Sequence, residues 1–514
     1  MRSATDKSVK LNRQLDKLLI EAMKKDLLVK IGWGREQDEK PREGEIGAIT
    51  HLPNKSKVLL LGNLGECAGA VNRGGIFTLQ GSASSMAGAF QESGKIIVER
   101  DVGSRAGYRM RGGAMIIQGS AGTEAAASMS GGIIIVRGHA GDRLGADMKG
   151  GLAIILGSTG TEPGLNMTGG KLVIAGSCPP PGDGVSMRSI NKKEIEECEI
   201  HLNALGLTIS DDALVLESSK PNKGIENLGL NSSIVENFEN ISLIPDNNEK
   251  VPAYKSIDPY TLILPRNLES EGALLPLPWL VECQSASKWK GDNANKQPAL
   301  VLEKPRNIDF VILNEQNIVN STNIIKDCAG IVVDLKKFPS MNDAELEAII
   351  VSLASRMSAS SLILLRNDVN RVEELFRLVV ELDLDGAVVD AAIPGGGRVS
   401  ATLPLIGLAA KSWNFKNSKR SIMIEVDKIP DIEDMLIVIA SGCDAIVGPI
   451  SQQEIENDFE DKNIKLRQWM AELGIDGLEK IGRKNLRANN YETAAISGLR
   501  LIGYNRPLPM WLNK

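Results

Sequence analysis

Glycine recurs every 19 residues through one stretch of the chain, and this interval restricts the folds that the stretch can adopt. The recurrence occupies two slots that lie six residues apart. The first slot holds Gly75, Gly94, Gly113, Gly132, Gly151 and Gly170. The second slot holds Gly62, Gly81, Gly119, Gly138, Gly157 and Gly176, with Arg100 in the remaining place. A fixed period of this kind is typical of repeat architectures, in which each unit packs only against its neighbours.

Short apolar runs follow the glycines and are expected to form strands. Examples are AMIIQ at 114–118, IIIVR at 133–137 and KLVIA at 171–175. One strand and several glycine turns in each 19 residues predict a right-handed parallel β-helix, with seven coils over 56–178 and a domain spanning 56–184. The recurring Met110, Met129, Met148 and Met167 are expected to stack inside it.

Composition excludes several classes of protein. Apolar residues make up 42% and charged residues 24%, which are ordinary globular values. The chain has no apolar run long enough to span a bilayer, and its first thirty residues lack the pattern of a secretory signal, so we expect a cytoplasmic protein without a membrane partner. The net charge is -6 and the basic residues are scattered, which argues against nucleic acid as a partner. Six separated cysteines and three separated histidines predict no metal site.

The rest of the chain is expected to contain four further segments. Residues 1–55 are predicted to be a helical capping segment, 185–260 a polar connector and 456–514 a helical segment. Between them, 261–455 alternates apolar strands with helical patterns such as 343–357 and 369–384. The strands are expected at 300–303, 310–313, 330–335, 362–366, 386–391, 422–426 and 445–449. This alternation predicts an α/β domain with a (β/α)₈-like barrel, degenerate in part.

Chemistry in such a barrel belongs at the carboxyl ends of its strands. The loop DAAIPGGGR at 390–398 is the best candidate, because Gly395, Gly396 and Gly397 would let backbone N–H groups approach a phosphate or a flavin. The same three glycines also suit a structural hinge. The segment IASGCDAIVGP at 439–449 is either a second flavin-binding strand or an ordinary buried strand.

Both halves of the chain resemble one known family. The unit GGIIIVRGHAGDRLGADM at 131–148 is similar to the GXGXG β-helix domain of the glutamate synthase large subunit, where it is structural. A similar β-helix occurs in one subunit of formylmethanofuran dehydrogenase, but a resemblance to that enzyme would not explain the second half of this chain. DGAVVDAAIPGGG at 385–397 and LRQWMAELGIDGLEKIGRKNL at 466–486 resemble the FMN barrel of glutamate synthase and the segment after it. The order of the two domains is inverted.

The resemblance implies an FMN-dependent oxidoreductase subunit that forms glutamate from 2-oxoglutarate and ammonia. It implies substrate contacts for Arg366, Asp390 and Arg398. It also implies that FMN lies against glycines of the two barrel segments, namely Gly395, Gly396, Gly397, Gly442 and Gly448.

Departures from the family pattern support a different function, that of a non-catalytic scaffold. The cysteine cluster for an iron-sulfur centre is absent, so none is expected on this chain. The family's GEGG loop is missing, EVDKI at 425–429 replaces its SGGI phosphate loop, and Arg366 stands near an expected lysine. The chain begins Met1-Arg2 and not with a nucleophilic cysteine. We therefore expect a glutaminase or electron-donor partner subunit, with a homo-oligomer as the alternative.

Overall fold

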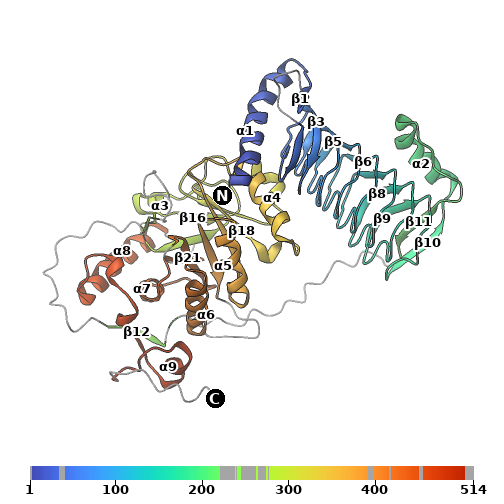
Figure 1. Cartoon of the computed structure of the whole chain (residues 1–514). Helices are drawn as coiled ribbons and strands as arrows, with labels where there is room; N and C mark the ends of the chain where they lie inside the picture. The colour runs from blue at the N-terminus through green and yellow to red at the C-terminus, as the bar shows by residue number, and fades with distance from the viewer. Residues whose placement is uncertain are drawn as a thin grey trace. The chain divides into compact units, whose positions relative to one another are not determined.

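The chain forms two compact units, so the prediction of a multi-domain protein is confirmed (Figure 1). The computed structural model describes residues 3–33, 41–219, 238, 240–244, 262–263, 274–275, 277–391, 399–415, 418–450 and 455–503. The first unit is Met1–Asn227 together with Met341–Arg356, and the second is Leu228–Ser340 together with Met357–Lys514. Among the described residues, every helix is too short or too polar to cross a bilayer.

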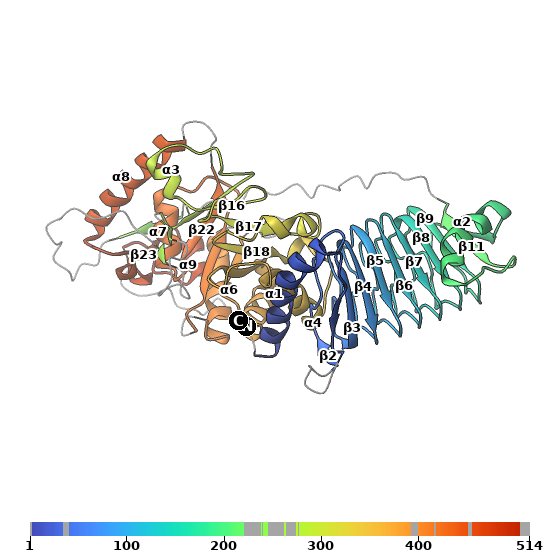
Figure 2. The same cartoon turned by 90° about the horizontal axis from the view of Figure 1, so that it is seen from above.

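Seven parallel strands in chain order build most of the first unit, which we call the repeat domain (Figure 2). They are β3 (Lys57–Leu64), β4 (Arg73–Gln80), β5 (Ser93–Val98), β6 (Ala114–Ile117), β7 (Ile133–Val136), β8 (Lys149–Ile155) and β9 (Gly169–Ile174). From β5 on, their register advances by one repeat per strand, pairing Ile97 with Ile116, Ile116 with Ile135 and Ile135 with Ile154. Before them, β1 (Val29–Ile31) and β2 (Arg42–Glu45) both pair with β3.

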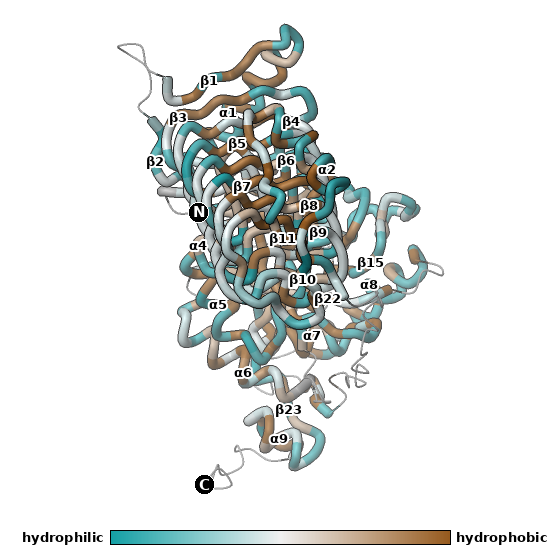
Figure 3. Tube along the Cα trace, turned by 90° about the vertical axis from the view of Figure 1, so that its right-hand side faces the viewer, coloured by the Kyte–Doolittle hydropathy of each residue, from teal (hydrophilic) through white to brown (hydrophobic). Residues whose placement is uncertain are grey.

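A second ladder of single bridges runs through the turns of the same repeats. It joins Leu64, Ala83, Val102, Ala121, Ala140 and Thr159 in succession. Apolar side chains fill the space between the ladders, and Met110, Met129, Met148 and Met167 are all buried there, which confirms the predicted internal methionine stack. Figure 3 shows these hydrophobic stretches recurring at the same place in successive layers.

The glycine column keeps neighbouring repeats close together. An added Cβ at Gly113 would lie 2.6 Å from the carbonyl oxygen of Gly94, and at Gly132 it would lie 2.8 Å from that of Gly113. Gly151 and Gly170 repeat this approach at 2.8 and 2.9 Å. These positions also have positive φ, +86° at Gly132 for example, so a side chain is excluded both by space and by backbone conformation. The predicted alignment of these glycines in one column is confirmed.

The far end of the repeat domain is closed by chain that continues past the last repeat. It forms β10 (Val185–Ser189), α2 (Lys192–Leu202), η1 (Asn203–Leu205) and β11 (Leu214–Ser218). Strand β11 pairs antiparallel with both β9 and β10. Strand β11, and not the prolines at 179–181, therefore covers the edge of the sheet. The first part of the predicted connector at 185–260 is folded.

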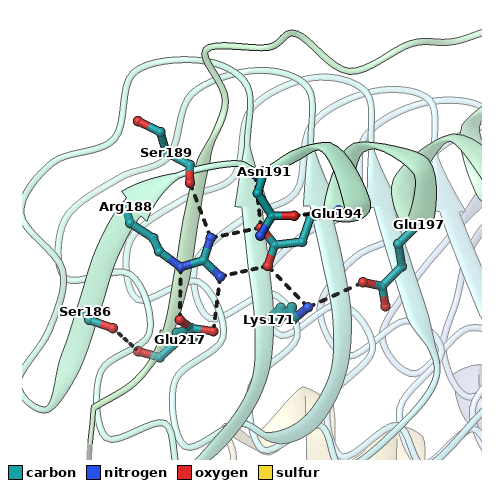
Figure 4. Close-up of polar contacts among 8 residues, drawn as sticks. All are labelled: Lys171, Ser186, Arg188, Ser189, Asn191, Glu194, Glu197 and Glu217. Atoms are coloured by element: carbon teal, nitrogen blue, oxygen red, sulfur yellow. Dashed lines mark hydrogen bonds and ion pairs between the residues drawn. The ribbon is translucent and has the colours of Figure 1, made fainter.

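A network of ion pairs holds this end together (Figure 4). Arg188 lies between Glu194, at 2.7 Å, and Glu217, at 3.1 Å, while Lys171 reaches Glu194 at 3.3 Å. Hydrogen bonds from Arg188 lower the pKa of Glu194 to about 2. Asn191 caps α2 by accepting from the Glu194 backbone N–H. Helix α2 is thereby fixed across the sheet.

The near end is covered by α1 (Ser3–Lys24) and α4 (Asp343–Ala354). Asn12 of α1 is buried and donates to the Gly47 carbonyl at 2.7 Å and to Ser355 Oγ at 3.1 Å. His51 lies 3.3 Å from Ser352 Oγ, and burial lowers its pKa to about 3. Helix α4 therefore packs on the repeat domain, although its sequence lies among the strands of the second unit.

The second unit contains a closed barrel of eight parallel strands, which confirms the barrel prediction. Sequence patterns located seven of them and missed the first, β15. The strands are β15 (Trp279–Cys283), β16 (Ala299–Val301), β17 (Phe310–Leu313), β18 (Gly330–Asp334), β19 (Leu362–Asp368), β20 (Gly386–Asp390), β21 (Ser421–Glu425) and β22 (Ala445–Pro449).

Helices separate most of these strands, as predicted. They are α3 (Asp292–Lys296), η3 (Ile318–Asn323), η4 (Leu335–Lys337), η5 (Val369–Arg371), α5 (Val372–Glu381), α6 (Val399–Ser412) and α7 (Ile432–Ala440). After the barrel come α8 (Ile455–Leu473), η6 (Leu478–Lys480), η7 (Arg483–Asn485), β23 (Leu486–Ala488) and α9 (Tyr491–Ser497). Strand β12 (Ile241–Leu243) pairs with β23, and β13 (Leu262–Ile263) pairs with β14 (Leu274–Leu275).

Gly132→Val should destabilise the repeat domain by more than about 3 kcal/mol, because the side chain would meet the adjacent repeat at a positive φ. The matched control is Gly206→Ala, since Gly206 has φ +67° but nothing within 4 Å of an added Cβ. It should cost only about 1 kcal/mol from backbone strain. Chemical denaturation measures both values, and equal losses would contradict the importance of the close approach.

Candidate functional site at the barrel mouth

Side chains alternate between the inside and the outside of the barrel, and this alternation defines a candidate site. Residues at every second position of the strands point into the barrel. Each strand contributes one of the following to the buried interior: Leu280, Leu300, Ile312, Val332, Leu364, Val388, Met423 and Val447. Continuing the same alternation to the carboxyl ends brings polar residues inward. They are Glu282, Asn314, Asp334, Arg366, Asp368, Asp390 and Glu425. We call this polar layer the barrel mouth.

Arg366 is the central cation of the barrel mouth. Its guanidinium donates to Asp334 Oδ2 at 3.2 Å and to Glu425 Oε1. Arg366 is 7% exposed, Glu425 8% and Asp334 fully buried. Arg366 thus bridges two buried carboxylates from different strands.

Lys336 of η4 makes a second set of ion pairs beside the first. Its ammonium group contacts Asp390 and lies 2.9 Å from Asp368 Oδ1. The strand register places Asp368 next to Asp390 and Asp390 next to Glu425, so three neighbouring strands end in carboxylates. Lys336 therefore compensates part of the repulsion along this edge.

Burial and neighbouring charges shift the pKa values of the barrel mouth. The pKa of Glu425 is raised to about 8, mainly by burial, while Arg366 opposes the rise and the charges of Glu282 and Asp390 contribute to it. Burial would lower the pKa of Arg366, but Glu425 and Asp334 raise it overall. Arg366 accordingly stays charged, while Glu425 titrates near neutral pH.

The structure brings together two of the predicted site residues, Arg366 and Asp390, at the barrel mouth. Arg398 and the glycines at 395–397 lie outside the described residues. Gly448 lies near the carboxyl end of β22, packed so that an added Cβ would be 3.1 Å from Pro430 Cδ. Gly442 lies in the turn before β22, at the opposite end of that strand. The two glycines therefore do not form one binding loop.

Five residues of the barrel mouth were not predicted as site residues: Glu282, Asn314, Asp334, Asp368 and Glu425. The neighbouring Lys336 was not predicted either. A signal for two of them was present in the sequence. GIVVD and SIMIE are buried strands that end in an acidic residue, as GAVVD does at Asp390. Glu282 and Lys336 follow no comparable pattern.

The described residues do not fit FMN. A flavin phosphate is a dianion that requires cations or free backbone N–H groups. At the barrel mouth the buried Arg366 and the more exposed Lys336 already bind carboxylates, and Glu425 stands at the end of β21 where the resemblance places a glycine loop. In the part of the chain that the structure describes, no group of three or more His, Cys, Asp and Glu side chains is arranged to hold a metal ion.

Arg366→Met should lower the free energy of unfolding by about 3–5 kcal/mol at pH 9, where Glu425 is mostly ionised, because Asp334 and Glu425 lose their buried cation. Adding Glu425→Gln and Asp334→Asn to it should recover most of that loss. Lys480→Met breaks an exposed ion pair of the same unit and should cost less than about 1 kcal/mol. Urea denaturation compares the variants. A loss as small for Arg366→Met as for Lys480→Met would contradict the buried network.

Comparisons with known proteins agree with the repeat domain. A family model described as the GXGXG motif matches residues 47–238. No curated protein matches the chain. One chain of a solved formyltransferase/hydrolase complex from Methylorubrum extorquens, bound to methylofuran, is 25% identical to this chain, with a TM-score of 0.27. The match covers 30% of this chain and 61% of the other, so this chain spans less than two thirds of that relative's length. That TM-score is too low for structural inference. The family match confirms the GXGXG resemblance that was predicted from the glycine repeat: residues 47–238 carry a GXGXG domain.

Proposed function

We propose that this chain is a non-catalytic structural subunit of a glutamate synthase-like complex. In this proposal the GXGXG domain is a docking element, and the barrel retains the fold of an FMN barrel without its cofactor. The observation that carries the proposal is the buried network of Arg366 with Asp334 and Glu425. In this proposal the network fills the part of the barrel mouth that a flavin enzyme would keep open for its cofactor.

We also infer that the GXGXG domain is a right-handed parallel β-helix. Two parallel ladders in register support this inference, one along the strands and one through the turns. Backbone hydrogen bonds also join the turns of successive repeats, for example from the Gly145 N–H to the Ala125 carbonyl at 2.7 Å. Stacked coils of this kind offer a long flank to a partner protein.

The competing function is an FMN-dependent oxidoreductase that forms glutamate from 2-oxoglutarate and ammonia. The closed barrel and the perturbed carboxyl group of Glu425 favour it, because such groups gather at active sites. It requires Arg366 to clamp a substrate carboxylate. Arg366 would first have to give up Asp334 or Glu425, which would leave a buried charge unpaired.

Purified protein is expected to be colourless and to take up no FMN. Equilibrium dialysis against FMN, followed by an absorbance spectrum in the flavin band, checks this. Stoichiometric uptake that Gly396→Val abolishes would establish the oxidoreductase and contradict the structural subunit.

Native extract is expected to contain the chain in a complex well above the 55.3 kDa of one copy. Size-exclusion chromatography, followed by identification of the co-eluting chains, should find a glutaminase-type or electron-donor subunit. A free monomer at cellular concentration would contradict the proposed function. A homo-oligomer without other subunits would contradict the proposed glutaminase-type or electron-donor partner.

A further inference from the structure

The barrel mouth carries more negative than positive charge. Among the described residues, its inward carboxylates come from five positions: Glu282, Asp334, Asp368, Asp390 and Glu425. Among the described residues, Arg366 pairs with Asp334 and Glu425, and Lys336 pairs with Asp368 and Asp390. Lys337 approaches Asp334 at 3.8 Å, but its side chain is 60% exposed. The local surplus of carboxylates would attract a cation.

Two carboxylates supply acceptors that none of the described residues uses. Glu425 Oε2 is buried and has no hydrogen-bond partner, although Oε1 of the same group binds Arg366. Glu282 makes no ion pair or hydrogen bond among the described residues. Strand β22 lies between the strands of the two carboxylates, because Glu282 of β15 pairs with Pro449 and Glu425 of β21 pairs with Val447. Both residues are therefore inward positions at the same end of the barrel, and the charge of Glu282 contributes to the raised pKa of Glu425. An unpartnered oxygen on a side chain that is more than nine-tenths buried normally marks a missing partner.

We propose that the barrel mouth binds the ammonium group of a small primary amine, held by Glu425 Oε2 and Glu282. An ammonium group has three donors and no acceptor, so it matches a surface of carboxylate oxygens. An anion is disfavoured by the same carboxylates. A metal ion is also disfavoured, because Arg366 holds one oxygen of Glu425 and the described acidic groups do not form a metal-ligating set. This inference is separate from the proposed function and does not depend on the partners.

Binding should depend on pH through Glu425. The charged groups that face it are Arg366 on β19, Glu282 on β15, Asp390 on β20 and Lys336 on η4, with Asp334 of β18 on the far side of Arg366. The pKa of Glu425 is raised to about 8, so its carboxyl group is mostly protonated at pH 6.5 and mostly ionised at pH 9. The ammonium ion binds the ionised form, so affinity should rise between these two pH values, and binding near pH 7 should release a proton.

The test is titration calorimetry of the full chain with methylammonium chloride at low ionic strength. We expect one site per chain, with affinity that increases from pH 6.5 to pH 9. Glu425→Gln and Glu282→Gln should each weaken binding about tenfold or more, because each removes a charged hydrogen-bond acceptor. Glu282→Gln leaves the ion pairs of Arg366 and Lys336 in place, so it decides the test if Glu425→Gln disturbs folding.

Three controls isolate the proposed contact. Glu472→Gln removes an exposed charge of the same unit and should leave the affinity unchanged. Tetramethylammonium carries the same charge without N–H donors and should bind at least about tenfold more weakly. Acetate should not bind. The proposal is overturned if methylammonium shows no saturable binding, if tetramethylammonium binds equally well, or if Glu282→Gln leaves the affinity unchanged.

Discussion

The close approach of one repeat to the next is the constraint on which the first half of the molecule depends. Gly113 and Gly132 show its origin, since an added Cβ at either position would lie within 2.8 Å of the neighbouring repeat. Only glycine combines that space with a positive φ at low cost. The same requirement returns in every repeat. The close approach of the backbones therefore explains both the 19-residue period of the glycines and the 19-residue register between strands.

The barrel shows how a strand pattern sets the chemistry of its ends. Inward positions are apolar along the strands and become charged at the carboxyl ends, where Asp334, Arg366 and Glu425 meet. A buried arginine between two carboxylates contributes little net stability, but removing one partner is costly. Single substitutions in this charged layer are therefore expected to be more costly than the joint replacement of all its members. At the end of β21, Glu425 stands where the resemblance to glutamate synthase implies a glycine loop.

The repeat and the barrel were predictable because both follow from periodicity, which a single sequence displays. The charged layer was not, since the partners of Arg366 are Asp334 and Glu425, which are 32 and 59 residues away. Only barrel closure brings them together. Strand β15 was missed because WLVEC lacks a preceding helical pattern and directly follows ALLPLP at 273–278, an apolar run that two prolines interrupt. The folded end at β10 and β11 was missed for a similar reason, because the glycine period stops before it.

Helix α4 belongs to the first unit, although its sequence lies between two strands of the second unit. Its sequence, DAELEAIIVSLA, is expected to be a barrel helix, since it lies between β18 and β19. It belongs to the first unit because Ser352 and Ser355 meet His51 and Asn12 there. Most of its residues are buried, so its sequence shows no single apolar face that would have indicated this partner. The first unit is therefore incomplete without a segment from the middle of the barrel sequence, and a fragment that ends before the barrel would leave Asn12 without the Ser355 hydroxyl to which it donates. The first unit is thus built from two separate stretches of the chain, with the second stretch inserted between two barrel strands.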